Sequence, residues 1–227
     1  MKSLYLGLIC LLFISSCKTE KKNDSSIDEE KTPLTVAEKI AGAHGIQYWY
    51  NVSEIEFTFK VDRDTIKGNG RSWVWKPKTQ DVKMMTSKDT IAYNRAEVDS
   101  TSLQADRAFI NDKFWLLFPF QLVWDENASI SKPTKAMAPI SQKEMNTITL
   151  LYPNEGGYTP GDAYDIFYND DYIIQEWAFR QGNADQPSLS NTFENYQEFN
   201  GLKIAIDHKK DAGKWNLNFA NVKVTLE

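Results

Sequence analysis

An unbroken apolar run at residues 114–124, FWLLFPFQLVW, constrains the fold of this chain most strongly. Apart from its two indole N–H groups, Gln121 is the only polar side chain in it. A bilayer-spanning helix needs about 20 apolar residues, so this run is too short to cross a membrane. The run is also not amphipathic, and no solvent-facing side can be drawn along it. We therefore expect the rest of the chain to cover it, as a β-sheet that curls around a central apolar plug.

The N-terminus has the pattern of a secretory signal. Lys2 precedes a short apolar stretch at residues 4–14, which is too short for a stable transmembrane helix. The next residues, Ser15-Ser16-Cys17, resemble the end of the bacterial lipobox. In that pattern the cysteine becomes the first mature residue and carries acyl chains, each of whose buried CH₂ groups contributes about 0.8 kcal/mol to anchoring. The alternative is an ordinary signal peptide with an incidental cysteine.

This assignment divides the chain into three parts. Residues 1–16 are the expected lipoprotein signal peptide, and residues 17–32 are the lipidated Cys17 with a polar tether too poor in apolar residues to fold. Residues 33–227 are expected to form a single domain. Because Cys10 leaves with the signal, the domain has no cysteine for a disulfide, a metal or catalysis. We expect anchoring in the bacterial outer membrane, on its periplasmic face.

Composition limits the partners. Removal of residues 1–16 takes away one basic residue, Lys2, and leaves 25 basic and 31 acidic residues, a formal charge of −6. Neither sign forms a long block in the domain, and without a basic stripe we expect no nucleic-acid partner. The expected partner is a membrane, through Cys17, together with a lipid or another apolar ligand.

Local patterns predict mostly antiparallel β-structure with a few helices. Thr35 and Glu38 have the spacing of a capping box, which predicts a helix that Gly45 ends. Alternating apolar residues and turn signals, of which Asn200-Gly201 is the strongest, predict about ten strands. A change of alternation at 220–221 predicts a bulge or a turn. The expected strands are 54–61, 65–75, 81–85, 90–93, 146–152, 163–168, 172–179, 191–199, 202–209 and 215–226, with a second helix at 102–111, a helical turn at Pro119 and a loop at 126–142.

Several segments share a pattern of alternation and aromatic residues. They are the strand Phe57-Thr58-Phe59, Trp115-Leu116-Leu117-Phe118-Pro119-Phe120, the segment Trp177-Ala178-Phe179, and residues 196–204, YQEFNGLKI. Together they resemble a family of envelope lipoproteins of Gram-negative bacteria. That family is similar in outline to the lipoprotein-localisation factors LolA and LolB. The resemblance implies an incomplete, LolA/LolB-like β-barrel wrapped around helical and apolar segments, with a hydrophobic cavity for acyl chains.

Few residues suggest catalysis. The sequence has two histidines, His44 and His208, and neither has a third ligand at metal spacing. We interpret His44 as a helix cap and His208 as a residue at the rim of the domain, although His208 with Glu176 or Asp207 could serve a hydrolase. Glu176 itself is expected to be exposed at the rim. No nucleophile or phosphate motif accompanies these residues, and we predict neither a cofactor nor a metal.

Two tryptophans allow opposite interpretations. Trp73 and Trp75 alternate with Val74 and share a face with Arg71. Exposed on that face, they could bind a glycan or a protein, which would leave the domain with a filled core. Alternatively they line the inner face of the sheet and belong to the core.

The leading hypothesis is a non-enzymatic lipoprotein whose half-barrel binds an acyl chain or another apolar ligand. Transfer of the ligand from water into a preformed cavity would supply about 25 cal/mol per Å² of apolar surface. Alternation and apolarity give the predicted cavity walls, which are Phe57, Phe59, Trp115, Phe118, Phe120 and Trp177.

Overall fold

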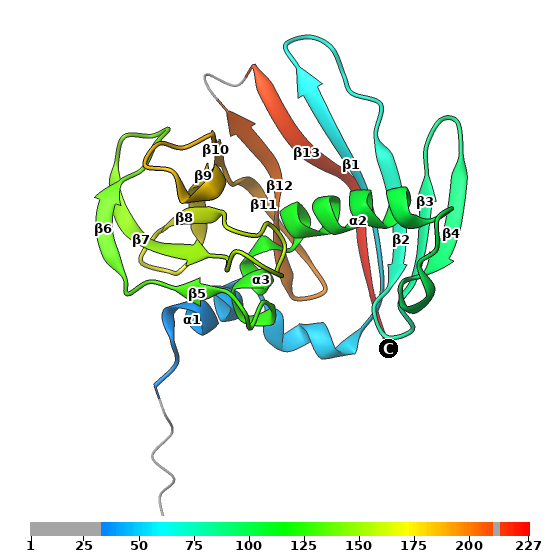
Figure 1. Ribbon diagram of the computed structural model, residues 1–227, viewed down its shortest axis with the longest axis horizontal. Helices are drawn as coiled ribbons and strands as arrows, with labels where there is room; N and C mark the ends of the chain where they lie inside the picture. Colours follow the sequence, from blue (N-terminus) through cyan, green and yellow to red (C-terminus); the bar gives the residue numbers. More distant parts are fainter. Residues whose placement is uncertain (1–32, 211–213) are drawn as a thin grey trace, which may run out of the picture. The chain divides into compact units, whose positions relative to one another are not determined.

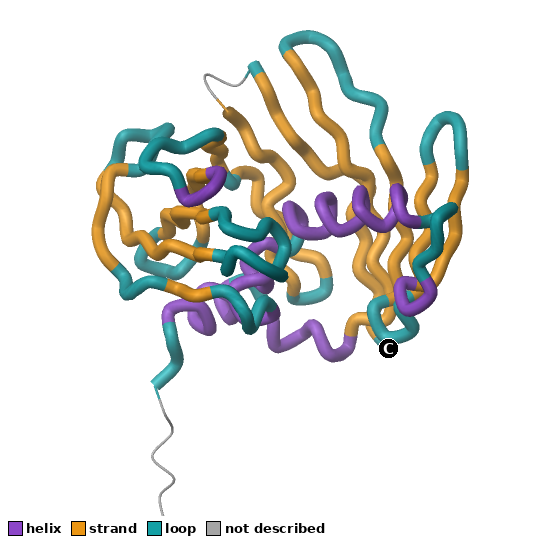
Figure 2. The backbone as a smooth tube through the Cα atoms, in the orientation of Figure 1, coloured by secondary structure: helices purple, strands orange, loops and turns teal. Residues whose placement is uncertain are grey.

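Two antiparallel sheets make up most of the structure (Figure 1). The strand order of the larger, seven-stranded sheet is β11-β12-β13-β1-β2-β3-β4. The order of the six-stranded sheet is β10-β9-β8-β7-β5, with β6 also paired to β7. Neither sheet closes on itself, so both keep free edges (Figure 2). The predicted fold class, mostly antiparallel β with a few helices and no closed barrel, is confirmed.

The computed structural model describes residues 33–210 and 214–227, of which 34–227 form one compact unit. The expected signal peptide, Cys17 and the tether at 17–32 lie outside the described residues. The described strands are β1 Val52–Arg63, β2 Arg71–Lys76, β3 Asp81–Met85, β4 Thr90–Asn94, β5 Ser129–Ile130, β6 Thr134–Met137, β7 Glu144–Leu151, β8 Ala163–Tyr168, β9 Ile174–Arg180, β10 Leu189–Thr192, β11 Glu194–Phe199, β12 Leu202–Lys210 and β13 Trp215–Leu226. The α-helices are α1 Val36–Ala43, α2 Leu103–Leu116 and α3 Phe118–Trp124, and the short 3₁₀ segments are η1 Ile46–Asn51, η2 Arg95–Glu97 and η3 Gln181–Asn183.

The first and last strands of the domain form the centre of the larger sheet. β1 and β13 are each 12 residues long and pair antiparallel from Val52↔Leu226 to Arg63↔Trp215. Their register shifts between Glu56 and Thr58, opposite Asn221, whose φ is +53°. The predicted irregularity at 220–221 is therefore confirmed as a bulge, which bends the strand pair.

The start of the domain is fastened to a hairpin from its end. Thr35 and Glu38 form the predicted capping box at the start of α1. Gly45 follows with φ +92°, and a Cβ there would lie 1.9 Å from the carbonyl oxygen of Gly201 in the β11–β12 turn. Only glycine permits this approach. The Lys203 N–H also donates to the His44 carbonyl at 2.9 Å, which ties α1 to β12.

The apolar run at 114–124 becomes the end of α2 and all of α3, and it lies between the sheets. Trp115 contacts Trp177 of the six-stranded sheet, with ring centroids 4.5 Å apart, and His208 of the seven-stranded sheet, at 5.6 Å. Phe118 also packs on Trp177, at 4.5 Å. Pro119 lies in the first turn of α3, where its missing N–H breaks no hydrogen bond. The expected central apolar plug is therefore present.

Four element predictions need correction. The strand expected at 65–75 begins only at Arg71, because the residues before it run beside β1 without joining its ladder (Figure 1). The expected strand 191–199 is divided at Phe193 into β10 and β11, which belong to different sheets. The helix expected at 102–111 continues to Leu116, and the loop expected at 126–142 contains β5 and β6.

Candidate functional site

The inner face of the seven-stranded sheet, defined as the face on which α2 packs, is covered at one end only. On β1 the inward side chains are Ile55, Phe57, Phe59 and Val61. The first three are buried, whereas Val61 is half-buried. The loss of burial along one row of apolar side chains shows where the cover over the sheet stops.

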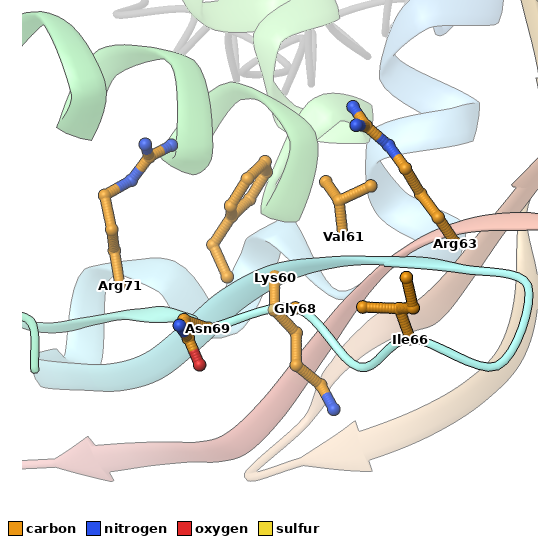
Figure 3. A pocket seen from close by; sticks show the side chains of 8 residues that line it. Lys60, Val61, Arg63, Ile66, Gly68, Asn69 and Arg71 are labelled. Atoms are coloured by element: carbon orange, nitrogen blue, oxygen red, sulfur yellow. The ribbon is translucent and has the colours of Figure 1, made fainter.

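A pocket of 420 Å³ opens at this less covered end (Figure 3). Pockets of about 300–1,000 Å³ are typical of small-molecule sites. Ile66, in the β1–β2 connection, is 72% exposed and contributes an apolar wall. We call it the rim pocket; its lining residues are Phe59, Lys60, Val61, Arg63, Ile66, Gly68, Asn69 and Arg71.

The β1–β2 connection is held in place by a buried carboxylate on the opposite side of β1. Asp62 accepts hydrogen bonds from the Gly68 N–H and the Lys67 ammonium, both at 3.0 Å. Burial alone would raise the pKa of Asp62, but these hydrogen bonds and the nearby lysines lower it overall. A Cβ on Gly68 would come within 2.2 Å of the Val61 carbonyl oxygen, so glycine is needed here. The wall of the rim pocket is thus a fixed part of the fold.

A second polar group fastens α2 over the sheet. Asp112 of α2 is 0% exposed, and its carboxylate accepts Arg71 Nε at 3.0 Å and Nη2 at 2.7 Å. Its other donors are Trp73 Nε1 at 2.8 Å and Asn111 Nδ2 at 3.0 Å. A buried carboxylate is tolerated only when paired in this way. Two contacts therefore connect β2 to α2: the ion pair of Arg71 with Asp112 and the hydrogen bond from the Trp73 indole to the same carboxylate.

A smaller pocket of 240 Å³ lies between α2 and the six-stranded sheet. Its walls are mostly aromatic, and Phe114 stacks on Tyr158 with ring centroids 3.7 Å apart. The Tyr158 hydroxyl donates to Asn111 Oδ1 at 3.1 Å. We call it the aromatic pocket; its lining residues are Asn111, Phe114, Trp115, Tyr158, Thr159, Tyr164, Trp177, Phe179 and Leu189.

Asp112 connects the two pockets. Arg71 lines the rim pocket and Asn111 lines the aromatic pocket, and both donate to the same Asp112 carboxylate. The chemistry available in this region is the burial of apolar groups beside a few fixed polar ones, which is the usual composition of a ligand site.

The six predicted cavity residues are all buried but do not line one cavity. Phe59 lies on the rim pocket, and Trp115 and Trp177 lie on the aromatic pocket. The remaining three, which are Phe57, Phe118 and Phe120, are packed in the core and belong to the lining of neither pocket.

The alternative of an exposed tryptophan surface is wrong. Trp73 and Trp75 are 1% and 8% exposed, and both pack on Phe109 of α2 with ring centroids 5.4 and 5.3 Å away. The face shared with Arg71 is the inner face, because Arg71 reaches Asp112 on the same helix. The core interpretation of the two side chains is the one that the structure shows.

The expected rim positions of Glu176 and His208 are also wrong. Glu176 is 2% exposed, and its carboxylate accepts the N–H groups of Ile140 and Ser141 at 2.7 and 2.9 Å. His208 is fully buried against the rings of Trp115, Phe193 and Phe219. Its Nδ1 pairs with the Thr192 carbonyl oxygen and not with Glu176 or Asp207. The pairing considered for a hydrolase is therefore not formed.

Burial has the same effect on both histidines. It lowers the pKa of His44, the residue that caps α1, to about 4, and it lowers the pKa of His208 to about 4. Both rings are neutral at pH 7, so His44 is not the cation that a helix C-terminus often attracts. Among residues 33–210 and 214–227, no group of three or more His, Cys, Asp or Glu is placed to hold a metal ion.

Sequence reasoning missed the polar and exposed parts of the rim pocket. Arg63 continues the inward alternation of Phe59 and Val61, so the period of two could have placed it on the inner face. No local pattern could pair Arg71 with Asp112, because 41 residues separate them.

No protein-family model matches the sequence, and no curated protein is significantly similar to it. In the part of the chain that the structure describes, no helix is long and apolar enough to cross a membrane. The structure is similar to the crystal structure of a LolA superfamily protein from Nitrosomonas europaea, with a TM-score of 0.48 and 8% sequence identity. The match covers 85% of this chain and 94% of that chain. At this identity the likeness concerns the course of the backbone alone.

Proposed function

We propose that this protein is a membrane-anchored envelope lipoprotein that binds an acyl chain or another apolar ligand without catalysis. The rim pocket carries the proposal. There the buried row of β1 continues into Phe59, Val61 and the exposed Ile66, so an apolar surface of the sheet remains partly uncovered. A chain laid on this surface would gain about 25 cal/mol for each Å² of apolar area removed from water.

The anchor rests on the sequence. The signal-like stretch, Ser15-Ser16 and Cys17 support acylation at Cys17, and the polar residues 18–31 would separate the domain from the bilayer. An anchored domain with an apolar pocket can bind a lipid close to the membrane that supplies it.

The first experiment is native mass spectrometry of residues 18–227, purified from the periplasm without detergent, followed by solvent extraction. The expected result is a co-purifying lipid or other apolar mass. A binding assay in solution complements this experiment. Parinaric acid methyl ester is an uncharged acyl chain, and its fluorescence should rise when it binds to the protein.

A substitution that fills the rim pocket tests whether the ligand binds there. Val61→Trp places an indole in the rim pocket and should weaken binding of the ester roughly tenfold or more, a loss of about 1.4 kcal/mol. Val74→Trp is the matched control, because Val74 is half-buried on the neighbouring strand and lines a pocket on the other face. A clean apo mass together with no binding of the ester would contradict the proposed function.

A further inference from the structure

The rim pocket has a basic lining. It contains three cationic side chains, those of Lys60, Arg63 and Arg71, and no acidic one. Figure 3 shows Arg63, Val61 and Arg71 pointing to one side of β1 and the β1–β2 connection, with Lys60 pointing to the other. The apolar Val61 therefore lies between two guanidinium groups. The basic lining contrasts with the formal charge of −5 for the whole chain.

The three cationic side chains differ in the carboxylates that lie near them. Arg71 forms a two-pronged ion pair with the buried Asp112. Lys60 lies 3.9 Å from Asp62, on the opposite side of the strand. Among residues 33–210 and 214–227, no carboxylate lies within 4.0 Å of the Arg63 guanidinium, although salt bridges connect nine other pairs. With respect to the described residues, Arg63 is therefore the cation of the pocket that carries no ion pair.

Arg63 is also placed at the correct end of the apolar surface for a head group. It is the last residue of β1, and it is exposed, whereas Phe59 is buried and Val61 is half-buried on the same inward row. The Arg71 guanidinium stacks over the Phe59 ring at 5.1 Å and closes the inner end. A ligand in this pocket would thus meet apolar groups inside and one planar cation at the mouth.

We propose that Arg63 binds the carboxylate of a long-chain fatty acid whose chain lies on Phe59, Val61 and Ile66; this assignment rests on the proposed function and names its ligand class. A guanidinium matches a carboxylate in two parallel hydrogen bonds. One unneutralised cation favours a head group with a single negative charge over a phosphate, which carries up to two.

The test compares parinaric acid with its methyl ester, since the two share one chain and differ in charge. The protein of residues 18–227, which contains the tether and the domain, should bind the acid at least tenfold more tightly than the ester. Arg63→Gln should remove that preference and leave binding of the ester within twofold. Arg107→Gln is the matched control, because Arg107 is an exposed arginine of α2 outside both pockets.

The outcomes separate the two proposals. If the wild-type protein binds neither probe, the proposed function fails. If it binds the ester, loses it in Val61→Trp, and shows no preference for the acid, only the role of Arg63 is overturned. The same holds if Arg63→Gln keeps the preference. Competition with lysophosphatidic acid tests the head group: if this phosphate-headed lipid displaces the ester and oleic acid does not, the carboxylate assignment is wrong.

Discussion

Two buried histidines make the stability of the domain sensitive to acid. The Nδ1 of His208 lies 3.2 Å from the Thr192 carbonyl oxygen, and its Nε2 has no partner among the described residues. Aromatic rings surround it, so a proton on this imidazole would be a poorly solvated charge. His44 is equally enclosed, between α1 and Tyr196. A proton on either ring therefore lowers the stability of the folded state.

The consequence is a loss of stability between pH 7.5 and pH 5. In the unfolded chain a histidine takes up a proton near pH 6.5, whereas these two do so in the folded chain only near pH 4. The unfolded state therefore binds more protons over this interval, and acid favours it. Each histidine should remove about 2 kcal/mol from the free energy of unfolding by pH 5.

The measurement is urea denaturation at both pH values. His208→Gln should lose about half as much stability as the wild-type protein over the interval, because one of two titrating groups is gone. His44→Gln is the matched variant and should behave alike. An unchanged pH dependence in both variants would contradict the assignment of neutral, buried rings.

At this scale the sequence predicts apolar positions better than polar ones. Alternation correctly placed Phe59 and Trp177 inside, since the side-chain period of a strand depends only on neighbours in the chain, and the apolarity of its run placed Trp115 there. It could not place Glu176, because the N–H groups that stabilise its buried carboxylate come from a loop 35 residues away. Whether a charged side chain can be buried depends on its hydrogen-bond partners, and these partners are distant in sequence.

At the scale of elements, α2 determines how much of the inner face is covered. Phe109 is fully buried between Trp73 and Trp75, and Asp112 follows one turn later. Asp106 adds an ion pair to Arg95 at 2.7 Å. Aromatic and charged contacts therefore alternate along the face of α2 that packs on the sheet.

Removing the aromatic contact should destabilise the domain strongly. Phe109→Ala is expected to cost about 4 kcal/mol, because it deletes a ring from a closed site and leaves a cavity between two indoles. Leu103→Ala is the control on the same helix, where an exposed side chain should cost less than about 1 kcal/mol. Chemical denaturation measures both. Equal losses would mean that α2 is not anchored through Phe109.

The element boundaries that failed have a common cause. The expected strand at 65–75 begins late because Gly68 and Asn69 follow the edge of β1 without continuing the ladder. The expected strand at 191–199 is interrupted at Phe193, where the chain passes from one sheet to the other, and Asn195 has a φ of +53°. Alternation predicts that a segment is extended, and it contains no information about which neighbour the segment pairs with.

At the scale of the whole molecule, the proposed anchor predicts where the protein is found in a cell. Cys17→Ser removes the sulfur that would carry the lipid, so the protein should move from the membrane fraction to the soluble fraction. Cys10→Ser changes the other cysteine, inside the expected signal, and should leave the protein in the membrane fraction. Fractionation followed by immunoblotting measures both. Retention of the Cys17→Ser protein in the membrane would contradict the acyl anchor.

The antiparallel architecture and its central apolar segment followed from the sequence, because hairpins are local and an eleven-residue apolar run must be buried somewhere. The division into two sheets and two small pockets did not follow. It depends on how large rings such as Trp115 and Trp177 fill the space between the sheets, and packing of this kind leaves no periodic signal in the sequence.

The central position of β13 also determines when the domain can form during translation. β1 ends at Arg63, whereas its partner begins at Trp215, so the ribosome makes roughly 150 residues between them. At about 5–20 residues per second this takes roughly 10–30 s. Throughout that time the middle of the larger sheet lacks a strand. The larger sheet therefore cannot be completed until β13 has been made, and an incompletely folded polypeptide is the state that can be threaded through a secretion channel.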